Sequence, residues 1–117
     1  MNAVVTPEWM LAHLRTLTDD WLNDNASRLV MRFDKMPEKF VPASDRNYSG
    51  QCLAKLASQG LQFEIRFAFS EDAQIEVSYL PPDHKNWREV KVPGSGPRAE
   101  TIAAIIAALL KGEMENR

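Results

Sequence analysis

The 117-residue sequence contains few of the features that mark specialised classes of protein. Its single cysteine, Cys52, cannot form an internal disulfide. The formal net charge is only −2, and no basic stripe or acidic block suggests a nucleic-acid partner or a mimic of nucleic acid. The most apolar stretch, Thr101–Leu110, is about half as long as a membrane span needs. These absences exclude a disulfide framework and argue against a membrane partner.

Localisation signals and site motifs are equally scarce. The first residues, MNAVVTPEW, have neither the basic start nor the apolar run of a secretory signal. Together with the single cysteine, this favours a soluble, cytoplasmic protein. The sequence has no HExxH, no CxxC and no Asp-rich calcium loop, so it predicts no metal and no cofactor.

What the chain does contain is the composition of a globular protein. Hydrophobic residues make up 44% of it and charged residues 26%, so it can bury a core without disulfides or metal. Its length suits a single domain over residues 1–117.

Start signals predict two helices, one near each end of the chain. The first, over about 7–23, begins at the N-cap Thr6 with Pro7 in the first position, where its missing N–H costs nothing. Its apolar stripe comprises Met10, Leu14, Leu17 and Trp21. The second, over about 97–111, begins at a proline and carries isoleucines and leucines among alanines, before a tail over 112–117.

Alternating apolar and polar residues predict up to five strands between these helices. The expected strands cover about 28–33, 51–58, 61–70, 74–80 and 87–92. Odd-numbered apolar residues point inward both before and after residues 71–73, so a three-residue loop there would pair Phe67 with Val77, and a five-residue loop is the alternative. Residues 34–49 contain two prolines and no clean period, which predicts a long irregular loop of the kind that often carries function.

The segment 51–58 is ambiguous, because its leucines also have helical spacing. A hairpin turn at 59–60 would place Leu56 opposite Phe63, so a smaller side chain would face a larger one. On the other face, the same register would place Lys55 directly across from Glu64. Because both faces agree, a strand is favoured, and a helix is the alternative.

This order of elements predicts an α+β protein. An antiparallel β-meander of four to five strands would form one layer. Because the strands are apolar on one face only, the N-terminal and the C-terminal helix would both pack on that face, which gives a two-layer architecture. An edge strand, 28–33 or 87–92, could pair with a second copy, so the expected state is a monomer or a homodimer.

The sequence predicts no catalytic residue. His13 lies on the flank of the first helix, and His84 lies in a turn beside Asp83, where local neighbours alone do not make a site. The predicted register places Cys52 inside, as a buried structural thiol. The loop PGSGPR could offer backbone N–H groups to an anion, but it matches neither a P-loop nor a dinucleotide fingerprint. An enzyme or small-ligand binder built on these groups is the least favoured of three hypotheses.

The leading hypothesis is a small non-catalytic protein-binding module that docks on a partner protein, as an inhibitor, an immunity protein or an accessory or regulatory factor. The predicted contact residues are Phe40, Tyr48, Trp87 and Arg88, because aromatic side chains in exposed proline-rich loops form protein-binding patches. Trp87 has a parity opposite to that of the core-facing valines that follow it. Two placements therefore stay open for it: exposed in the patch, or folded back onto the long loop.

The alternative is a nucleic-acid-binding accessory protein that uses the basic and aromatic segment 84–98. Lys85, Lys91 and Arg98 would contact phosphates, or an isolated anion. Asp83 and Glu89 dilute the positive charge of this segment. Because the chain as a whole also lacks a basic footprint, protein binding is favoured over nucleic-acid binding.

Overall fold

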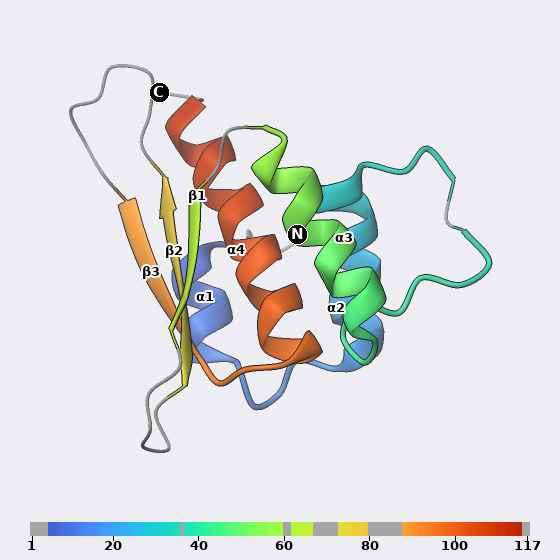
Figure 1. Cartoon of the computed structure of the whole chain (residues 1–117), viewed down its shortest axis with the longest axis horizontal. Helices are drawn as coiled ribbons and strands as arrows, with labels where there is room; N and C mark the ends of the chain where they lie inside the picture. The colour runs from blue at the N-terminus through green and yellow to red at the C-terminus, as the bar shows by residue number, and fades with distance from the viewer. Residues whose placement is uncertain (1–4, 36, 60–61, 67–72, 80–87, 116–117) are drawn as a thin grey trace.

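The computed structural model describes residues 5–35, 37–59, 62–66, 73–79 and 88–115 (Figure 1). The elements in chain order are α1 (Pro7–Ala12), α2 (Asp19–Asn25), the π-helix η1 (Ala26–Met31), α3 (Arg46–Ala57), β1 (Gln62–Arg66), β2 (Gln74–Tyr79), β3 (Arg88–Pro93) and α4 (Pro97–Glu115).

The helix α4 lies at the centre of the protein. Figure 1 shows the sheet on one side of it and α3 on the other, and α1, α2 and η1 also pack against it. Residues 99–107 are all buried, including the alanines of this stretch. A helix that is apolar all round belongs inside a protein, and its small side chains let neighbouring elements approach closely. The alanine-rich sequence of α4 is therefore explained by its central position.

The described strands form one antiparallel sheet in the order β1–β2–β3. Ile75 and Val77 of β2 and Val92 of β3 are fully buried, and the sheet turns this apolar face to α4. Odd residues pair with odd residues between β1 and β2, as predicted, but Val77 pairs with Phe63 rather than with Phe67. The three-residue loop is therefore wrong, which fits the poor tolerance of alanine for the positive φ such a loop needs at its last position. Residues 67–72 lie outside the described part of the chain.

The expected meander of four to five strands is wrong, because two of its strands are helical. Residues 51–58 fall largely in α3, which begins where the Asp45 carboxylate accepts a hydrogen bond of 2.9 Å from the Asn47 N–H. Ser49, Cys52 and Leu56 lie on the buried face of this helix. The helical spacing of its apolar residues thus prevailed over the hairpin register. This face is buried against α4 and η1, and these tertiary contacts outweigh the local strand pattern.

Residues 28–33 form the end of η1 and its exit, not a strand. At the junction with α2, the Asn25 amide donates to the Trp21 carbonyl at 2.8 Å, and the Ser27 hydroxyl donates to the Asp24 carbonyl at 2.7 Å. Such side-chain bonds compete with backbone N–H groups for the same carbonyls. They accompany the change from α-helical to π-helical pairing at this point.

The single helix predicted over 7–23 is two helices. Thr6 caps α1 as predicted, but a second cap follows at Thr18, whose hydroxyl accepts a hydrogen bond of 3.1 Å from the Trp21 N–H. The expectation of two layers is also wrong, because α2, η1 and α3 form a further layer on the side of α4 away from the sheet (Figure 1). The last helix begins at Pro97 as predicted and continues through Gly112 to Glu115 instead of ending at 111.

Candidate functional site

Three aromatic rings form a connected cluster at the exit of η1 and the start of α3, which we call the aromatic surface. The ring of Phe33 meets Phe40 edge to face, with centroids 5.2 Å apart, and Phe40 meets Tyr48 in the same way at 5.7 Å. Phe40 is only 6% exposed, whereas Phe33 is 38% exposed, and Tyr48 is half-buried. Within the described part of the chain, Phe33 is the large apolar side chain that remains exposed. The cluster therefore runs from the core to solvent.

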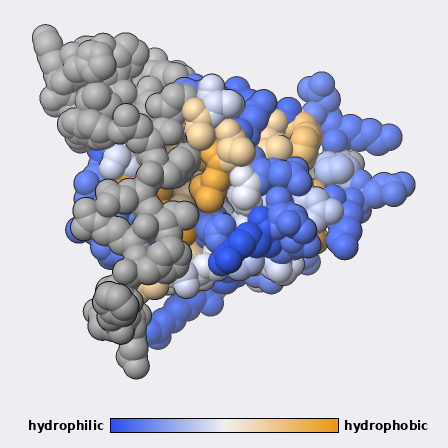
Figure 2. All heavy atoms as spheres, viewed as in Figure 1, coloured by the Kyte–Doolittle hydropathy of each residue, from blue (hydrophilic) through white to orange (hydrophobic). Residues whose placement is uncertain are grey.

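The aromatic surface stands at the base of a projecting loop between η1 and α3 (Figure 1). Arg32 has a left-handed backbone with φ of 55°, and the Phe33 N–H caps η1 by donating to the Ser27 carbonyl at 3.1 Å. This cap fixes the direction in which the chain leaves the helix. The side chains that follow it are exposed and carry both signs of charge: Asp34, Lys35, Glu38 and Lys39. Figure 2 shows small hydrophobic areas enclosed by hydrophilic atoms on the face turned to the viewer.

The structure separates the predicted partner-binding residues into two places. Phe40 and Tyr48 come together in the aromatic surface. Arg88 begins β3, on the other side of α4 (Figure 1), where it forms ion pairs with Glu8 of α1 at 3.1 Å and Glu113 of α4 at 3.8 Å. Trp87 lies outside the described residues, so its exposure stays a prediction.

Two of the predicted anion-binding residues are described, and each has a different acidic partner. The Lys91 ammonium is 3.7 Å from the carboxylate of buried Glu76 on β2. Arg98 forms an ion pair with Asp19 at 2.8 Å and donates to carbonyl oxygens of the α1–α2 connection. Lys85 lies outside the described residues. The two described cations thus already hold acidic partners within the chain.

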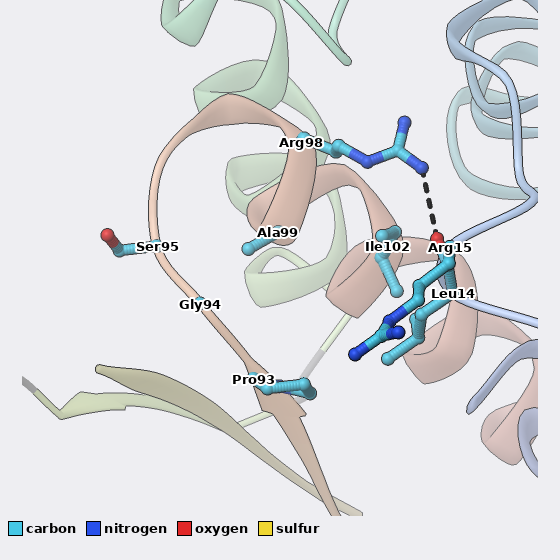
Figure 3. A pocket seen from close by; sticks show the side chains of 8 residues that line it. All are labelled: Leu14, Arg15, Pro93, Gly94, Ser95, Arg98, Ala99 and Ile102. Carbon is cyan, nitrogen blue, oxygen red and sulfur yellow. Dashed lines mark hydrogen bonds between the residues drawn. The ribbon is translucent and has the colours of Figure 1, made fainter. Parts of the chain in front are cut away.

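A second candidate site is a cavity of about 310 Å³ beside the loop PGSGPR, which we call the β3–α4 pocket (Figure 3). The residues that line it are Leu14, Arg15, Pro93, Gly94, Ser95, Arg98, Ala99 and Ile102. Gly94 and Gly96 have φ values of 98° and 90°, which L-residues with a side chain rarely adopt. These glycines let the chain curve around the cavity between β3 and α4.

His13 and Cys52 are structural, whereas His84 and Asp83 lie outside the described residues. The His13 ring stacks on Trp9 with centroids 4.4 Å apart, and its Nδ1–H donates to the Trp9 carbonyl at 2.7 Å. The thiol of Cys52 is fully buried, as predicted, and burial raises its pKa to about 12. Among the described residues, no group of three or more histidine, cysteine or carboxylate side chains is placed to hold a metal ion. In the same residues, no helix is both long enough and apolar enough to cross a membrane.

Sequence reasoning missed two residues of these sites. Phe33 is the last residue of the expected strand 28–33 and was not named as a contact residue, and its exposure follows from the path of the chain after η1. Arg15 was placed in the middle of one long helix, whereas it lies in the connection between α1 and α2. The second capping threonine, Thr18, was the sequence signal that could have revealed this connection.

Comparison of the chain with protein-family models, with curated proteins and with solved structures returned no match.

Proposed function

We propose that the protein is a non-catalytic binding module that docks on a partner protein through the aromatic surface, as an inhibitor, immunity protein or accessory factor. The observation that carries this proposal is the exposure of Phe33, whose ring packs against the buried ring of Phe40. The exposed part of the Phe33 ring, joined to the packed rings behind it, offers a partner apolar area whose burial favours association. We expect the module to act in the cytoplasm, where its single thiol stays reduced.

The packing behind Phe33 makes it suitable as an anchor. Phe40 is buried and contacts the Phe33 ring edge to face. Tyr48 contacts Phe40 in the same way. A ring that is already held in place loses little side-chain entropy when a partner covers it. Binding energy at protein interfaces concentrates in such aromatic anchors, surrounded by polar residues that exclude water.

The charges around the anchor indicate the chemistry of the partner. Asp34 and Glu38 alternate with Lys35 and Lys39 on the loop beside Phe33, and with the exposed Arg32 the rim has three basic and two acidic residues, a mixture of both signs. Nucleic acids and anionic membrane surfaces both select for clusters of basic residues, and this rim lacks such a cluster. A folded protein with an apolar pocket and a rim of mixed charge is the occupant that fits. The alternative of nucleic-acid binding gains no support from Lys91 and Arg98, because both are paired within the chain.

The proposal is tested by photo-crosslinking in the native cell. A photoreactive phenylalanine derivative replaces Phe33 in one variant and the exposed Glu89 of β3 in the control variant. A protein that crosslinks at position 33 and not at position 89 is then purified and titrated against the unlabelled chain. We expect Phe33→Ala to weaken this complex about tenfold or more, and Lys55→Ala, on the exposed face of α3, to leave it unchanged.

Two outcomes contradict the proposal. Equal crosslinking at positions 33 and 89 would show that the contacts are unspecific. Crosslinking of position 33 only to a second copy of the chain, with a dimer in sedimentation equilibrium, would make the aromatic surface a self-association site instead.

A further inference from the structure

The β3–α4 pocket has apolar walls from three separate parts of the chain. Leu14 comes from the α1–α2 connection, Pro93 from the end of β3, and Ala99 and Ile102 from the first turns of α4. The volume of this pocket is about 310 Å³. This size falls at the lower end of the range of small-molecule sites in proteins.

Of the two cations that line this pocket, Arg15 and Arg98, only Arg15 has no partner among the described residues. Within the described residues, the guanidinium of Arg15 has neither an ion pair nor a hydrogen bond, and the residue is exposed. Figure 3 shows the Arg15 side chain running beside Leu14 with its guanidinium turned toward the Pro93 side of the pocket. Arg98, by contrast, points to the Leu14 carbonyl, and the Ser95 hydroxyl points away from the cavity (Figure 3). Arg15 is thus the cation available to a ligand.

The walls are held in position without a ligand. Arg98 ties α4 to the α1–α2 connection through the Leu14 and Leu17 carbonyls. On the opposite wall, the Gly94 N–H donates to the Ala73 carbonyl at 2.7 Å, which fixes the end of β3 to the sheet. A cavity whose walls are fixed in advance requires little ordering when a ligand binds.

We propose that the β3–α4 pocket binds a small aliphatic carboxylate, a function separate from docking on a protein. The aliphatic chain lies against Leu14, Pro93 and Ile102, and the carboxylate pairs with Arg15. A guanidinium holds a carboxylate through two parallel N–H···O bonds, a geometry that an alcohol or an ammonium group does not reproduce. The apolar walls add affinity in proportion to the chain length that they cover.

The test titrates the ¹⁵N-labelled full chain with hexanoate, hexanol, hexylamine and acetate, and follows the amide signals of Gly94 and Gly96 by NMR. We expect hexanoate to bind about two- to fivefold more tightly than hexanol, since an ion pair with an exposed guanidinium contributes at most about 1 kcal/mol. Acetate, which lacks the aliphatic chain, and hexylamine, which has the opposite charge, should bind more weakly still. Equal binding of hexanoate and hexanol would overturn the role of Arg15, and no signal change with hexanoate would overturn the site.

Two variants distinguish the contribution of the Arg15 guanidinium from that of the apolar walls. Arg15→Gln should remove the preference for hexanoate over hexanol, whereas Lys55→Gln, which removes an exposed cation from α3, should leave that preference intact. Leu14→Ala should weaken hexanoate and hexanol by the same factor, because it removes only apolar contact. A preference that survives Arg15→Gln would contradict the proposal.

A carboxylate can also come from the end of a polypeptide, so the titration includes a short acetylated peptide ending in leucine and its amidated form. Binding of the acid peptide without binding of hexanoate would overturn the assignment to a small free acid. The pocket shares no residue with the aromatic surface. Phe33→Ala should therefore leave hexanoate binding unchanged, and the two proposals fail or hold separately.

Discussion

The guanidinium of Arg98 donates a hydrogen bond of 3.1 Å to the carbonyl oxygen of Leu14, across 84 positions of the sequence. A second bond reaches the Leu17 carbonyl, and the same side chain pairs with Asp19 at 2.8 Å. The end of a helix leaves carbonyl oxygens without backbone N–H partners. Arg98 supplies hydrogen-bond donors to the segment that connects α1 to α2. A residue of α4 therefore stabilises the connection between these two helices.

Replacing Arg98 by alanine should therefore destabilise the protein more than breaking its ion pair does. We expect Arg98→Ala to lower the free energy of unfolding by about 1–3 kcal/mol, because bonds from a charged donor to carbonyls are lost. Asp19→Asn should cost less than about 1 kcal/mol, since the pair is largely exposed to solvent. Urea denaturation of both variants measures the difference. Equal losses would show that the ion pair, not the carbonyl contacts, carries the effect.

The elements with strong local signals could be predicted from the sequence. Thr6 and Pro7 start α1, and Pro97 starts α4, where the sequence analysis placed them. The alternation of apolar and polar residues within 74–80 and 87–92 predicts strands that correspond to β2 and β3. In each case the capping or alternating residues are neighbours in the chain, so no knowledge of the tertiary contacts is needed.

The errors lie where distant contacts decide between two local patterns. Residues 51–58 fit a strand and a helix equally well by spacing, and burial of Cys52 and Leu56 beside α4 decided for the helix. The alternation of 28–33 suggested a strand, but the side-chain bonds of Asn25 and Ser27 belong to a continuous helical turn. For the candidate sites, Phe40 and Tyr48 are predicted from their place in a proline-containing loop, but Phe40 is buried in the structure. The exposure of Phe33 depends on the path of η1.

Because α4 is packed on all sides, it should not tolerate larger side chains. We expect Ala104→Leu, at a position with 0% exposure, to lower the free energy of unfolding by about 1–3 kcal/mol through overpacking. The matched control is Ala54→Leu on the exposed side of α3, which should change stability by less than about 0.5 kcal/mol. Thermal unfolding followed by circular dichroism compares the two. A neutral Ala104→Leu would mean that α4 has space beside it.

The three rings of the aromatic surface should divide into a structural part and a binding part. Phe40→Ala should cost about 3–5 kcal/mol of stability, because it leaves a cavity between Phe33 and Tyr48. Phe33→Ala should cost less than about 1 kcal/mol, since its ring is 38% exposed. Denaturant titration gives both values. A large loss of stability in Phe33→Ala would make this ring part of the core and remove the argument for its role in binding.

The buried thiol of Cys52 gives the stability a specific dependence on alkaline pH. Burial raises its pKa from 9.0 to about 12, so the folded chain keeps the proton at pH values where the unfolded chain loses it. The contribution to stability is therefore complete below about pH 9 and is lost as the pH rises from there toward about 12. The loss amounts to at most about 1.4 kcal/mol per pH unit.

Comparison with Cys52→Ala isolates this contribution, because lysines and tyrosines titrate equally in both proteins. We expect the wild-type chain to lose stability faster than Cys52→Ala between pH 9 and pH 11, and the two profiles to run parallel between pH 6 and pH 8. Guanidinium denaturation at each pH, with a reductant present, provides the measurement. Parallel profiles above pH 9 would mean that the thiol reaches water in the folded state. Modification by a thiol reagent at pH 8, slow in the folded chain and fast after denaturation, checks the same burial independently.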